Sequence, residues 1–82
     1  MRTMSNCYIP LDRLPIGSMG RVKRLMAKDH SRRRMLDLGL ISDTVVEALR
    51  QSPSGDPVAY QIRGAVIALR SEEAANILVE LV

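Results

Sequence analysis

The sequence is poor in aromatic residues. It has no tryptophan, no phenylalanine and only two tyrosines, Tyr8 and Tyr60. We therefore expect a core of leucine, isoleucine, valine and methionine. Grooves that recognise proline-rich peptides, and surfaces that stack single-stranded bases, both need several exposed aromatic side chains. The composition argues against both kinds of site.

Cysteine and histidine are equally scarce, with one residue of each, Cys7 and His30. A lone cysteine cannot close an internal disulfide, which suits a reducing cytoplasm. A metal site usually combines several Cys, His, Asp or Glu side chains at suitable spacing. The adjacent pair Asp29 and His30 would point in different directions on a helix, so polar residues at a helix start explain it better. We predict no metal site and no cofactor.

No set of residues resembles a catalytic site. His30 is the only evident general base, and nothing in the sequence places a nucleophile beside it. The segment from Gly17 to Gly20 is too short and wrongly flanked to be a phosphate-binding loop. We therefore expect a protein that is not an enzyme.

Long apolar runs are missing as well. No segment approaches the roughly 18 apolar residues of a membrane span, and the first residues lack the apolar stretch of a signal peptide. We expect a cytoplasmic protein without direct membrane insertion. Residues 1–8 read as a flexible leader, and residues 9–82 as one small domain.

Positive charge is concentrated in one part of the chain. The net charge is +3, but seven basic residues and one acidic residue lie between Arg21 and Arg34, so that segment carries +6 and the rest −3. This asymmetry predicts a basic surface that attracts an acidic protein, a phosphate backbone or lipid headgroups.

The segment 29–50 contains a helix, a helix stop and a strand. Asp29 or Ser31 can cap a helix whose apolar face includes Met35 and Leu36, and Gly39 can end it in the left-handed conformation. The first helical turn would then hold Arg32, Arg33 and Arg34. Cations are unfavourable at that end of a helix dipole, which suggests that they are kept for an acidic partner.

Alternating apolar residues and turn residues predict a mainly β fold. The predicted strands are residues 20–27, 44–49, 58–62, 65–70 and 77–82. Residues 65–70 are apolar without interruption, which predicts burial on both faces. Gly64 fits a tight reversal, Leu11 and Leu14 fit one helical turn, and Ser71 fits the cap of another turn over residues 71–76. Together these elements predict a small five-stranded barrel with one short helix and a helical turn.

Several segments, in order, resemble one known family. They are Leu11-Asp12-Arg13-Leu14-Pro15-Ile16-Gly17, Gly20-Arg21-Val22, residues 33–40, residues 56–64 and Ile67-Ala68-Leu69-Arg70. From about residue 9 to residue 79 the chain resembles the ferrous iron transport protein A (FeoA-like) family. The resemblance implies an SH3-like barrel that acts as a cytoplasmic accessory protein with the large GTPase-coupled ferrous iron permease of the inner membrane. The family often has Pro-Gly where this chain has Ser42-Asp43, and Asp tolerates the left-handed conformation, so we expect the turn to be kept.

Two functions follow from these observations. The first is binding to an acidic cytoplasmic part of the permease through Arg32, Arg33, Arg34, Leu36 and Leu40, with Gly39 and Gly64 as structural turn residues. The alternative is an SH3-like module of an iron-responsive regulator, whose barrel is similar, or a nonspecific nucleic-acid-binding module.

We favour the first function and expect no nucleic acid partner. Only eight residues precede Ile9, so a regulator would need its DNA-binding part on a separate chain. Two further alternatives stay open: Leu40 could simply plug one end of the barrel with the arginines solvated, and the chain could self-associate weakly.

Overall fold

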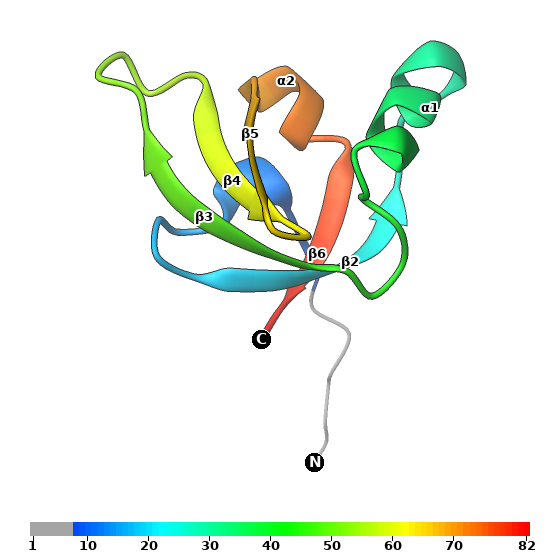
Figure 1. The fold of residues 1–82 in the computed structure, drawn as a ribbon, viewed down its shortest axis with the longest axis horizontal. Coiled ribbons are helices and arrows are strands. Elements are labelled where there is room, and N and C mark those ends of the chain that lie inside the picture. The colour runs from blue at the N-terminus through cyan, green and yellow to red at the C-terminus, as the bar shows by residue number, and fades with distance from the viewer. Residues whose placement is uncertain (1–7) are drawn as a thin grey trace.

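The computed structural model describes residues 8–82, which form one antiparallel sheet with short helical segments (Figure 1). The elements of this part are β1 (Tyr8–Pro10), η1 (Leu11–Arg13, a 3-10 turn), β2 (Met19–Leu25), α1 (Asp29–Asp37), β3 (Val45–Gln51), β4 (Val58–Ile62), β5 (Ala65–Leu69), α2 (Ser71–Ala74) and β6 (Ile77–Leu81). The predicted mainly β fold is confirmed.

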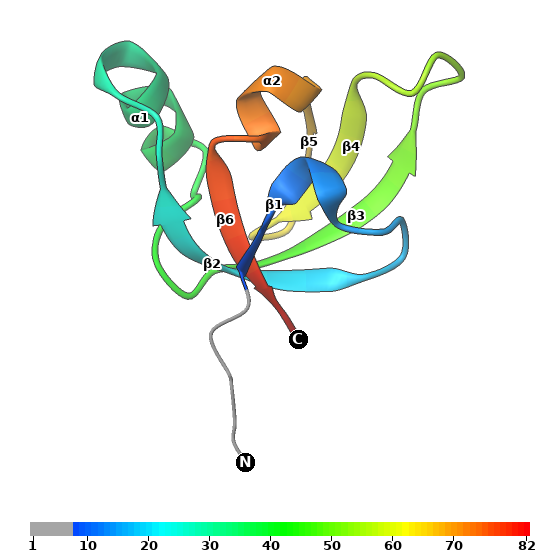
Figure 2. The ribbon, with the colours of Figure 1, turned by 180° about the vertical axis from the view of Figure 1, so that it is seen from behind.

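The strands follow the order β1-β6-β2-β3-β4-β5, and every neighbouring pair is antiparallel. The sheet curls strongly, and its register shifts in β2 after Val22 and in β3 after Ala48. Such bulges increase local twist and help a sheet to bend. Seen from behind, β1 and η1 cover one side of the curled sheet, with β1 beside β6 (Figure 2).

The core lies inside the curl and is mostly aliphatic, as expected. Its fully buried side chains include Leu11, Val22, Met35, Leu40, Val46, Ile62, Leu69, Ile77 and Val79. The largest buried side chain is nevertheless aromatic: Tyr60 of β4 is only 1% exposed. Its hydroxyl donates to the Leu11 carbonyl, so its one polar atom is satisfied inside the core.

Two strands differ from the prediction. β1 is an additional sixth strand, and it places Tyr8, which the sequence assigned to the leader, opposite Glu80 of β6; the rest of the predicted leader lies outside the described residues. This strand could not be predicted, because a segment of only three residues that ends in proline shows no alternation of apolar and polar residues. The predicted burial of residues 65–70 on both faces is wrong, because β5 pairs only with β4 at the sheet edge and leaves Val66 59% exposed.

Both helix caps also differ from the prediction. The N-cap position of α1 is Lys28, no side chain caps it, and Asp29 already belongs to the helix with φ +55°. Capping by Asp29 or Ser31 is therefore wrong. The N-cap position of α2 is Arg70, not Ser71, and the Glu73 carboxylate accepts the Arg70 backbone N–H at 3.0 Å.

Candidate interaction groove

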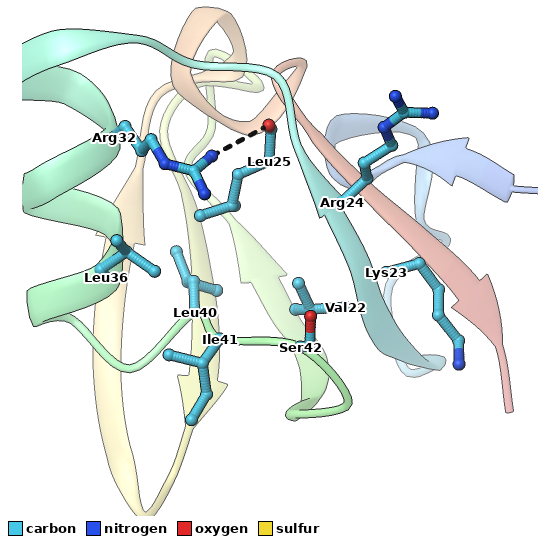
Figure 3. A pocket seen from close by; sticks show the side chains of 9 residues that line it. All are labelled: Val22, Lys23, Arg24, Leu25, Arg32, Leu36, Leu40, Ile41 and Ser42. Carbon is cyan, nitrogen blue, oxygen red and sulfur yellow. Dashed lines mark hydrogen bonds between the residues drawn. The ribbon is translucent and has the colours of Figure 1, made fainter.

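A groove lies between α1 and the end of β2. It has a volume of about 310 Å³ (Figure 3). We call it the α1–β2 groove. It is lined by Val22, Lys23, Arg24, Leu25, Arg32, Leu36, Leu40, Ile41 and Ser42.

Arg32 is the cation that reaches into this groove. Its guanidinium extends from α1 toward β2, and Nη1 donates to the Leu25 carbonyl across 3.4 Å. In the same view, the side chains of Lys23 and Arg24 project away from α1. A guanidinium has five N–H donors, so Arg32 keeps most of its donors for another group.

Lys23 is engaged elsewhere. Its ammonium donates to Asp43 at 3.0 Å and lies 3.7 Å from Glu80. The hydrogen bond to Asp43 is the main reason why the pKa of Lys23 is raised. Lys23 therefore stays charged but contributes little free charge to the groove.

Apolar side chains form the rest of the groove. Leu36 is 40% exposed and Ile41 44% exposed, and both border it. Leu40 and Val22 lie beneath them and are fully buried. The prediction that Leu40 belongs to an exposed contact face is therefore wrong, since this residue packs in the core below the groove.

The three consecutive arginines of α1 do not all share one environment. Arg32 faces the α1–β2 groove, and it also borders a neighbouring hollow of about 430 Å³ together with Arg33. The other residues that line this hollow are Asp29, Leu36 and Asp37. Arg34 forms an ion pair with Glu73, which joins α1 to α2. Arg32 and Arg33 therefore lie on adjoining parts of one surface, whereas Arg34 is engaged by Glu73.

The prediction that the three arginines occupy the first turn of the helix is also wrong. Because α1 begins at Asp29, Arg32 is its fourth residue and Arg34 lies in its last turn. A cation in the last turn complements the helix dipole, so the expected electrostatic cost does not exist for Arg34.

The predicted turn residues adopt the left-handed backbone conformation. Gly39 has φ +98°, Asp43 φ +70° and Gly64 φ +85°, which is the region predicted for each. Gly39 ends α1 directly before Leu40, so it sets the path of the chain from the helix into the groove floor. Arg63 also has positive φ, as a two-residue type I′ hairpin between β4 and β5 requires.

Sequence reasoning missed Leu25 and Ile41 as groove residues. Leu25 lies in a predicted strand, and its place at the groove depends on the Arg32 side chain, which comes from another element. Ile41 could have been found, because it is a large apolar residue in the short connection after Gly39.

Two kinds of feature are absent from residues 8–82. These residues contain no group of three or more His, Cys, Asp and Glu side chains placed to hold a metal ion. No helix in this part of the chain has the length and apolar character needed to span a membrane.

The fold and the groove belong to a chain with known relatives. The sequence profile of the FeoA domain matches residues 9–81. This chain belongs to the FeoA domain family. The resemblance noted in the sequence is therefore confirmed.

One relative of this chain comes from Porphyromonas gingivalis. The relative is an Fe(2+) transport protein A/Fe(2+) transporter FeoB fusion protein, 32% identical over 72 residues. The match covers 88% of this chain and 8% of the fusion protein, so the chain corresponds to a small part of that protein. The family is thus associated with ferrous iron transport.

Solved structures agree with the fold. The FeoA-like protein from Clostridium acetobutylicum is 33% identical with a TM-score of 0.85, and the match covers 92% of this chain and 87% of that one. FeoA of Stenotrophomonas maltophilia, solved with zinc and described as a prokaryotic SH3 domain protein, is 28% identical with a TM-score of 0.76. That match covers 85% of this chain and 87% of the other. The SH3-like character of this FeoA domain is confirmed.

Proposed function

We propose that this chain is a cytoplasmic accessory protein of ferrous iron transport that binds the cytoplasmic part of the GTPase-coupled iron permease and modulates it. One observation carries the proposal: a similar domain is joined to the transporter FeoB in a single chain in Porphyromonas gingivalis. Domains fused in one organism often act together as separate chains in another, and fusion raises the effective concentration of the second partner.

The proposed role is binding, not catalysis. The α1–β2 groove supplies a cation, Arg32, beside the exposed apolar side chains Leu36 and Ile41. An apolar centre with a charged rim is typical of protein interfaces, in which arginine is enriched. The neighbouring Arg33 extends the positive charge along α1.

The direct test is titration calorimetry of the purified chain with the purified cytoplasmic part of the ferrous iron permease from the same cell. We expect saturable one-to-one binding that weakens as salt is added, because charges contribute. The variant Arg32→Glu with Arg33→Glu should keep the parent melting temperature and lose most of this affinity. These two residues suit the test because neither has an ion-pair partner in residues 8–82, whereas Arg34 does.

Duplex DNA is the competing ligand to include. If the parent chain binds duplex DNA with an affinity that falls steeply with salt, but does not bind the permease domain, the proposed transport role is contradicted. The nucleic-acid-binding role then replaces it. The variant Arg13→Glu with Arg50→Glu, at two exposed positions outside the groove, is a matched control with the same two charge reversals.

A further inference from the structure

We infer that the α1–β2 groove takes a short partner segment that presents a carboxylate next to a large aliphatic side chain. This inference rests on the proposed function and specifies the chemistry of the partner at the same site. It follows from the separation of the charged and apolar parts of the groove.

Arg32 indicates that the partner segment presents a carboxylate. Among residues 8–82, no carboxylate lies within ion-pair distance of this guanidinium, and its one internal bond, to the Leu25 carbonyl, spans 3.4 Å. That bond holds the arginine across the groove with its remaining donors available. A planar guanidinium in this position matches a carboxylate, which it can bind through two parallel hydrogen bonds.

The exposed apolar pair below Arg32 indicates that the partner segment also presents an aliphatic side chain. In Figure 3, Leu36 lies to one side of the buried Leu40 and Ile41 lies below it, and each of the two is a little under half exposed. The groove contains no aromatic side chain and therefore no platform for a base or a proline-rich helix. A volume of about 310 Å³ accommodates one or two aliphatic side chains and lies at the small end of ligand sites.

A lipid surface or a polyanion fits this arrangement less well. Both would be bound best by several cations that face one way. Here Lys23 is paired with Asp43, Arg34 is paired with Glu73, and Arg24 projects away from the groove. Arg33 lies in the neighbouring hollow beside the carboxylates of Asp29 and Asp37, which repel a polyanion. One inward guanidinium above an apolar pair favours a segment with one acid and one aliphatic residue.

The test uses short overlapping peptides that cover the permease's cytoplasmic part, measured by fluorescence anisotropy with the full chain. We expect the best-binding peptide to contain adjacent acidic and aliphatic residues. Changing its acid to the amide, or its aliphatic residue to alanine, should each weaken binding by about fivefold or more.

Protein variants supply the second half of the test. Arg32→Gln should abolish the difference between the acid and amide peptides, while Leu36→Ala or Ile41→Ala should abolish the difference between the aliphatic and alanine peptides. Arg13→Gln and Val66→Ala, at exposed positions outside the groove, are matched controls that should bind like the parent. Melting temperatures show whether each variant is folded, and Ile41→Ala replaces Leu36→Ala if the latter is not.

Three results would overturn the inference. The first is binding of the permease domain that is insensitive to all three groove variants. The second is equal binding of scrambled peptides. The third is Arg32-dependent binding to heparin, or to vesicles of phosphatidylglycerol in phosphatidylcholine, that is stronger than binding to the best permease peptide. Failure of the whole domain to bind the chain is a different result, which contradicts the proposed function itself and removes the inference with it.

Discussion

The Tyr60 hydroxyl donates a hydrogen bond to the Leu11 carbonyl at 3.3 Å, across 49 positions of sequence. This bond ties β4 to the η1 turn inside the core. The same carbonyl also accepts the Leu14 backbone N–H at 3.0 Å. The carbonyl therefore keeps one partner if the hydroxyl is removed.

Tyr60→Phe should consequently destabilise the fold only modestly. We expect a loss of about 0.5–1 kcal/mol in the free energy of unfolding, because one hydrogen bond disappears without leaving a buried group unpaired. Urea unfolding at neutral pH measures this value. A loss above about 2 kcal/mol would show that the carbonyl depends on the hydroxyl.

Alkaline pH should weaken the parent more than Tyr60→Phe. Burial raises the pKa of Tyr60 to about 12, above its usual value of 10.0. As pH rises above 10, the unfolded chain releases this proton while the folded chain retains it, so stability falls with pH. The contribution is complete below pH 10 and is lost as pH approaches and passes 12.

The loss attributable to Tyr60 should be on the order of 2 kcal/mol at pH 12. The measurement is the difference in unfolding free energy between the parent and Tyr60→Phe at several pH values from 9 to 12. The phenylalanine variant controls for every other group that titrates in this range. Parallel pH profiles of the two proteins would contradict the assignment.

Gly39→Val should destabilise the domain by about 1–3 kcal/mol. Valine is strained at φ +98°, and a Cβ at this position would lie 2.6 Å from Cδ of Arg63. Thermal melting checks this prediction. Gly64→Val is the matched control, because it has the same backbone strain at φ +85° with no atom within 4 Å of the added Cβ.

The two glycine variants also separate strain from contact. Gly39→Val should melt below Gly64→Val, and adding Arg63→Ala should recover part of that difference. If Gly39→Val melts within a degree or two of the parent, its role as the helix stop is refuted.

The ion pair between Arg34 and Glu73 should contribute little to stability. Their side chains are 51% and 28% exposed, so water and salt screen their attraction. A double-mutant cycle with Arg34→Gln and Glu73→Gln should give a coupling energy below about 1 kcal/mol, and less in high salt. A coupling of about 2 kcal/mol or more would instead indicate that this pair holds α1 in place.

Local patterns predicted most of the fold. The strand at residues 58–62 matches β4 at both ends, because strict alternation and flanking Pro and Gly residues delimit it. The helix end at Gly39 was equally readable, since few residues adopt its conformation. The exposed face of β5 was not readable, because an edge strand and a central strand of alanine, valine and isoleucine have the same composition.

The groove was predicted only in part. Arg32 and Leu36 were identified because charge and helical spacing are properties of one segment. The burial of Leu40 and the pairing of Arg34 with Glu73 were not, because each depends on residues brought from distant parts of the chain. The shifted helix start also mattered, since the position of an arginine relative to the dipole depends on where the helix begins.

The pairing of β1 with β6 has a consequence for tethered forms of this domain. Tyr8 lies opposite Glu80, so the first and last strands of the described chain run side by side, with α1 at a different corner of the molecule (Figures 1 and 2). A polypeptide attached beyond either strand would leave from the same side of the sheet. Because both points of attachment lie away from α1, one docking geometry of the groove could serve both a free chain and a fused one.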